Sequence, residues 1–185
     1  MGRMHERGLA VGLKGPGEVG APMAGLPPDV EALVRAAHVG AAVVWLGLVY
    51  ASALVLPKAM GSLADATRRE VLPRLARAMV PWLVWSSVLT VAFGFALYAS
   101  IGLALGFGSM RWGTNLGAAL ALLMFALGHL FVVPTQRAMA RALDGNAMPG
   151  SGRMRRAVFV GRVNAFLSFG VLFFMVMTPR VSWLA

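Results

Sequence analysis

The residues able to do chemistry in this chain are few, and they lie inside long apolar runs. His38 follows Arg35 by three residues and precedes Trp45 by seven, so a helix would place all three on one face. A neutral imidazole on the inner face of an apolar helix is suited to bind haem iron, and an arginine beside it can pair with a propionate. His38 is therefore the candidate metal ligand, with Arg35 and Trp45 around it. The alternative is a histidine packed against a neighbouring helix, with Arg35 extended towards lipid head groups.

Three further polar residues lie in the later apolar runs. Asn164 needs a hydrogen bond to another helix, and Arg162 precedes it by two residues, so both are candidates to support the site. Plain helix packing for Asn164 and head-group contact for Arg162 are the alternatives. His129 would lie roughly 15 Å deeper than His38 at a rise of about 1.5 Å per residue, so we do not expect the two to share one iron.

Other chemistries lack their parts. The chain has no cysteine, which excludes disulfides, thiolate metal sites and covalent c-type haem attachment within it. Glu31 lies at the very start of the first apolar run, and no carboxylate lies deeper in any run. Paired-acid catalysis and carboxylate proton relays therefore lack the residues they need, and a coupled transporter has little support.

The composition indicates lipid as the solvent. Of the 185 residues 58% are hydrophobic and 13% are charged, and the mean hydropathy is +0.73, whereas a soluble domain carries about 25% charged residues. The apolar residues form four blocks of spanning length, at about 30–57, 79–107, 112–133 and 157–178. We therefore predict an all-α membrane protein, a bundle of four transmembrane helices within 29–180. Residues 1–28 are rich in Gly and Pro and are predicted to be a disordered tail.

The arginines gather between the apolar blocks. Residues 58–78 mix Arg68, Arg69, Arg74 and Arg77 with apolar side chains, which predicts an amphipathic segment on the membrane surface between helices 1 and 2. Loops one and three hold five Lys or Arg each, against Arg111 in loop two and Arg180 after the last helix. The positive-inside rule then places both basic loops in the cytoplasm and both termini outside. The net charge of +10 is thus interpreted as contact with membrane lipids, not with nucleic acid.

The pattern of residues resembles the membrane domain of cytochrome-c-linked bacterial urate oxidases. The first run carries the similarity through Arg35, His38, Trp45, Gly47, Tyr50 and Pro57. The second carries it through Pro73, Arg74, Trp82, Trp85, Thr90 and Gly94, and the third through Pro134 and Gln136. The fourth carries it through Arg162, Asn164, Leu167, Ser168 and residues 172–175. Copper-resistance membrane proteins and small membrane protoporphyrinogen oxidases have similar layouts, but the fourth run fits them less well.

The resemblance implies a multi-pass protein of the bacterial inner membrane that takes part in redox chemistry. It implies haem b as cofactor, with His38 as axial ligand, and a c-type cytochrome or larger membrane complex as electron-accepting partner. The family often has a histidine just after the Phe-Phe-Met stretch, where this chain has Val176, Met177 and Thr178; Met175 or Met177 is the alternative second ligand. The other hypothesis is a structural or assembly subunit that has lost the cofactor.

Overall fold

The computed structural model describes residues 25–145 and 147–177, and all secondary structure within these ranges is helical. The chain forms four helical rods. The first consists of α1 (Pro28–Tyr50), a π-helical turn η1 (Ala51–Val55) and α2 (Leu56–Gly61). The second is α3 (Asp65–Leu105), and the third consists of α4 (Trp112–Leu127), a π-helical turn η3 (Gly128–Val132) and α5 (Val133–Arg141). The fourth is α6 (Ser151–Met177), and short 3-10 turns, η2 (Phe107–Ser109) and η4 (Ala142–Asp144), follow α3 and α5.

The prediction of four long apolar helices is confirmed. Each rod contains a stretch that is long and apolar enough to cross a membrane. Every rod extends beyond its apolar run at one end at least, because hydropathy detects only the apolar part of a helix. At its other end α3 stops at Leu105, two residues before the predicted end at 107. Arginine, alanine and glutamate also favour helix, so the charged flanks continue it.

The prediction of a separate surface segment over 58–78 is wrong. Its first residues belong to α2, and α3 begins at Asp65 and continues through Pro73 and Pro81 without a break. The tail prediction is also too long at its end, because Pro28 opens α1, where its missing N–H costs no hydrogen bond. Residues 1–24 of that tail, Thr178 and Arg180 lie outside the described residues.

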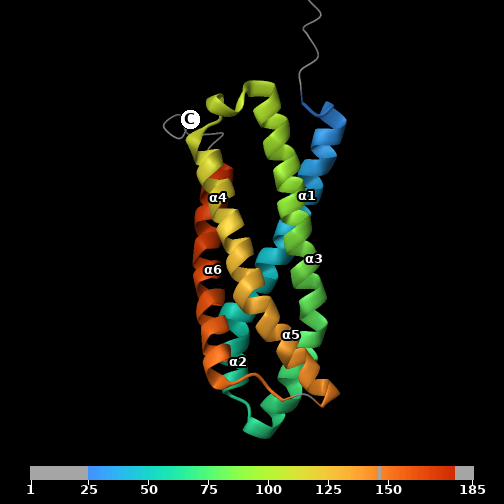
Figure 1. Ribbon diagram of the computed structural model, residues 1–185, viewed down its shortest axis with the longest axis vertical. Coiled ribbons are helices and arrows are strands. Elements are labelled where there is room, and N and C mark those ends of the chain that lie inside the picture. The colour runs from blue at the N-terminus through green and yellow to red at the C-terminus, as the bar shows by residue number, and fades with distance from the viewer. Residues whose placement is uncertain (1–24, 146, 178–185) are drawn as a thin grey trace, which may run out of the picture.

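The rods alternate in direction (Figure 1). The start of α1, the end of α6 and the connection between α3 and α4 lie at one end of the bundle. The α2–α3 and α5–α6 connections lie at the other, which we call the basic end because its flanking residues include the arginines of loops one and three. The described chain therefore separates its charge along the length of the bundle.

The first and third rods exchange neighbours along their length. α1 packs along α3 and α4 packs along α6, whereas nearer the basic end α5 packs against α3 and η1 against α6. Each rod contributes to one central cluster, which contains Trp45, Leu83, Met124 and Ala165. Met124 is only 1% exposed, so its side chain is almost completely enclosed in this cluster.

Most large apolar side chains lie outside this core. In the most apolar 18-residue stretch of each rod, only 17–22% of the residues are buried. Trp82 and Phe166 are 67% and 77% exposed. The bundle therefore presents an apolar surface around its sides, whereas a soluble protein would cover that surface with polar groups.

The first and third rods carry the same local distortion, a π-helical turn before a proline. A proline lies two residues after the end of each π-helical turn, Pro57 after η1 and Pro134 after η3. Proline lacks an N–H, and its ring clashes with the carbonyl four residues earlier, so the preceding turn widens. Both wide turns contact α6. The two halves of the chain thus share one arrangement: a rod interrupted by a π-helical turn before a proline, followed by a long antiparallel helix, α3 in the first half and α6 in the second.

A buried hydroxyl pair joins the first and last rods. The Oη of Tyr50 lies 2.5 Å from the Oγ of Ser168, which is fully buried. Ser168 uses its single hydrogen on the carbonyl oxygen of Ala165, at 2.7 Å. Since a carbonyl can only accept, Tyr50 must be the donor to Ser168.

We expect Tyr50→Phe to lower the free energy of unfolding by about 1 kcal/mol, because it deletes a buried hydrogen bond between rods. The matched control is Tyr98→Phe, which removes an exposed bond of 2.8 Å to Asn115 and should change stability little. Unfolding in mixed detergent micelles measures both. In a Ser168→Ala background the Tyr50 substitution should cost nothing more; an undiminished cost there would contradict the assigned bond.

Candidate functional site

His38 lies on α1 at the contact with α3. Its Nδ1 is 2.8 Å from the carbonyl oxygen of Thr90. Because a carbonyl oxygen can only accept, Nδ1 carries the hydrogen, and the lone pair of the neutral ring lies on Nε2. Metal-binding histidines have the same arrangement, in which a hydrogen bond from one ring nitrogen fixes the tautomer and orients the other towards the metal.

Gly94 lets α3 approach the imidazole closely. A β-carbon at this position would lie 2.8 Å from Cε1 of His38 and 3.1 Å from Nδ1. Thr90 and Gly94 are one helical turn apart, so the carbonyl that orients the ring and the gap that admits it lie on the same face of α3. Both residues belong to the Thr-x-x-x-Gly pattern in the sequence, but the sequence contains no signal that they meet His38.

The three residues predicted to share one face of α1, Arg35, His38 and Trp45, each lie in a different environment. The Nη2 of Arg35 lies 2.5 Å from the Oε1 of Glu31 in its own helix, and the arginine side chain is 60% exposed. His38 contacts α3, and Trp45 is buried in the central cluster. The common spacing therefore does not bring the three side chains into one pocket, and Trp45 serves the core.

The supporting residues lie at another contact. Asn164 is buried on α6 and donates from Nδ2 to the carbonyl oxygen of Met124 on α4, at 3.0 Å. Arg162 is exposed on the same helix. His129 donates from Nδ1 to the carbonyl of Phe125 at 3.1 Å and stacks on that ring. His38 and His129 therefore have separate surroundings, the first at α3 and the second against Phe125 of its own rod.

No three His, Asp or Glu side chains gather as a metal site in the part of the chain that the structure describes. One imidazole is a weak site for a bare ion but a sufficient axial ligand for haem iron, because the porphyrin supplies the other nitrogens. Met175 lies against Gly117 of α4, with its Cε 3.7 Å from where a β-carbon of that glycine would be. The described contacts of Met175 are thus with α4, whereas His38 faces α3.

A separate cavity of about 240 Å³ lies towards the basic end, where all four rods contribute to its lining. Its wall is mainly apolar and includes Met60, Met79, Met139 and Met154. Gln136 also lines it, and its buried Oε1 has no hydrogen-bond partner within the described residues. The sequence pattern drew attention to Gln136, but only the packing of four rods shows that it faces a cavity.

Comparison with protein-family models, with characterised proteins and with solved structures finds no match to this chain. The function is therefore argued from the contacts themselves.

We expect Gly94→Ala to lower the free energy of unfolding by about 1–3 kcal/mol, because the added methyl group must displace the His38 ring. Gly47→Ala is the control: Gly47 is exposed in α1 with nothing within 4 Å, so alanine should stabilise the helix by about 0.5–1 kcal/mol. Unfolding titrations in detergent compare the two.

The pair Gly94→Ala and His38→Ala then isolates the contact. If the imidazole is what the methyl group meets, most of the cost of Gly94→Ala disappears once His38 is alanine. A cost that stays the same in both backgrounds would show that α3 is strained for another reason.

Proposed function

We propose that this chain is a multi-pass membrane protein of the bacterial inner membrane and that His38 is an axial ligand of haem b. It would then serve as an electron-transfer subunit that delivers electrons to a c-type cytochrome or a larger membrane complex. The observation that carries the haem proposal is the hydrogen bond from Nδ1 to Thr90, which leaves Nε2 of His38 as the basic nitrogen. The membrane proposal rests on four long apolar helices with large side chains facing outwards.

The residues of the chain fit one axial ligand and its support. When bound, haem b supplies a one-electron iron couple. The Thr90 carbonyl holds the imidazole in one tautomer, which leaves the lone pair of Nε2 available to a metal. Gly94 keeps the ring against α3, so that less side-chain freedom is lost when a ligand binds. Arg35 would have to leave Glu31 to reach a propionate, so the proposal depends on His38 and not on Arg35.

A structural or assembly subunit is the second candidate, and the close packing of His38 favours it. Residues of the sequence pattern form three contacts between rods: His38 meets Thr90 and Gly94, Tyr50 meets Ser168, and Asn164 meets Met124. A chain that keeps these contacts can keep the fold without a cofactor. The two candidates differ in whether the purified protein binds haem.

We expect the purified protein, titrated with haem, to bind about one equivalent and to show a dithionite-reduced minus oxidised difference spectrum typical of a b-type cytochrome. His38→Ala should lose the spectrum, because it removes the nitrogen that ligates the iron. His129→Ala is the matched control and should retain it. Identical spectra for the wild type and His38→Ala would reject haem binding at this residue and favour the assembly subunit.

The topology has its own test, because the chain lacks cysteine and each introduced thiol reports alone. Ser62→Cys and Gly150→Cys lie in the two basic connections, and Gly108→Cys lies between α3 and α4. In spheroplasts a membrane-impermeant maleimide should label position 108 and leave 62 and 150 unlabelled until the membrane is opened. Labelling of all three positions at once would contradict the membrane placement.

A further inference from the structure

A groove of about 490 Å³ opens at the basic end, between α3, α5, η4 and α6. Its charged lining consists of Arg77, Arg137, Arg141, Arg153 and Asp144. Four arginines against one aspartate leave three net positive charges in one hollow. The sequence accounts for these arginines as topology signals, but it does not predict that they line one groove.

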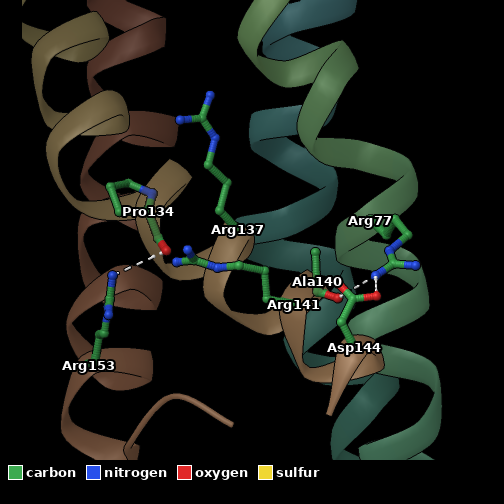
Figure 2. Close-up of a pocket in the computed structure, with 7 residues that line it drawn as sticks. All are labelled: Arg77, Pro134, Arg137, Ala140, Arg141, Asp144 and Arg153. Atoms are coloured by element: carbon green, nitrogen blue, oxygen red, sulfur yellow. Dashed lines mark hydrogen bonds and ion pairs between the residues drawn. The ribbon is translucent and has the colours of Figure 1, made fainter. Parts of the chain in front are cut away.

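Asp144 forms an ion pair with Arg77 at one side of the groove. The Nη2 of Arg77 lies 2.6 Å from the Oδ1 of Asp144 and 3.2 Å from the carbonyl oxygen of Ala140. Figure 2 shows this pair on one side, whereas the side chains of Arg141 and Arg153 extend towards Pro134 from α5 and α6. Among the described residues that line the groove, Asp144 is the one acidic residue, and its carboxylate accepts from Arg77.

The opposite side of the groove concentrates positive charge around a weak acceptor. Arg153 donates from Nη2 to the carbonyl oxygen of Pro134, at 3.2 Å. A carbonyl has only a partial negative charge and cannot neutralise a guanidinium group. Like charges in the lining of one groove repel each other, so an anion bound between them would be held favourably. A phosphate fits this role, because its oxygens match the planar donors of arginine.

The position of the groove indicates where the phosphate comes from. Pro134 follows the apolar run of the third rod directly, and Arg153 is in the first turn of α6, just before its apolar part. In the proposed membrane orientation the groove lies at the depth of the cytoplasmic head groups. Basic pockets between helices on this side of a membrane bind lipids with several negative charges.

We propose that this groove binds the head group of an anionic phospholipid, and that a head group with two phosphates, of the cardiolipin class, fits it best. The volume exceeds what one phosphate needs, and three net charges can pair with two phosphates. The inference rests on the proposed membrane placement but not on haem binding, since His38 lies on the half of α1 away from the basic end.

Native mass spectrometry of the full chain, released from detergent micelles, tests the groove. Cardiolipin, phosphatidylglycerol and phosphatidylcholine are titrated separately, and cardiolipin is expected to bind most tightly. In the double variant Arg137→Gln/Arg141→Gln the dissociation constant for cardiolipin should rise about 10- to 30-fold, from about 1 kcal/mol for each arginine near a membrane surface. All substituted side chains are exposed, so the variants should fold.

Two further variants separate the groove from net charge. Arg69→Gln/Arg155→Gln removes the same charge from exposed arginines of the same loops that do not line the groove, and it should change affinity less than threefold. Asp144→Asn removes the acid and should tighten cardiolipin binding. Equal losses in both double variants would overturn the groove, because they would show a general charge effect.

Two further measurements distinguish a lipid head group from free phosphate, and failure of the groove proposal from failure of the membrane placement. Inorganic phosphate at millimolar concentration should not displace cardiolipin; if it does, the groove binds free anions and the lipid inference is wrong. Alkaline carbonate extraction reads membrane insertion without involving the groove. A protein that stays in the pellet but binds all three lipids equally overturns this inference alone, whereas a protein released into the supernatant overturns the membrane placement first.

Discussion

Small and polar side chains, not large apolar ones, make the closest contacts between the rods, and the rest of the structure depends on this. Ser87, Thr90, Asn164 and Ser168 are buried, whereas aromatic and leucine side chains cover the outside. In the proposed membrane, an apolar solvent would give such large side chains no reason to leave the surface, and the helices would associate through close approach and a few hydrogen bonds. Asn164 and Ser168 each take part in a hydrogen bond to a neighbouring rod, and so does the Thr90 carbonyl. The hydroxyl groups of Ser87 and Thr90 donate within α3, so these two side chains are satisfied where large ones would keep the rods apart.

The prolines give this packing its shape. Pro57 and Pro134 widen the turns before them, and the widened turns are where the first and third rods both contact α6. Gly161 lies against Ala53 of one turn, and Gly128 of the other lies near Asn164. The crossing separates the His38 contact from the basic groove, so a redox site and a lipid site would occupy different ends of one scaffold and need not interfere.

Much of the fold could be predicted from the sequence, and the errors have one cause. Hydropathy detects the stretch of a helix that avoids water, so the four runs were found, but their charged extensions in α3 and α6 were not. The interleaved arginines of residues 58–78 suggest a separate surface helix, yet the same residues are good helix formers, and α3 continues through them. The helical period places Arg35, His38 and Trp45 on one face of α1. Along that face the neighbours change, so Arg35 pairs with Glu31, His38 contacts α3 and Trp45 lies in the central cluster.

What the sequence by itself determined is the class of the chain: four apolar helices, the ends that carry the charge, and the short set of polar residues that need a partner. These follow from local quantities, namely hydropathy, helical period and net charge. Only the tertiary structure decided that the Thr90 carbonyl orients His38, that Trp45 belongs to the core and that arginines of three segments form one groove. Such contacts depend on how rods cross, and crossing is set by the approach of residues up to 118 positions apart, as for Tyr50 and Ser168. No local pattern encodes a distance of that kind.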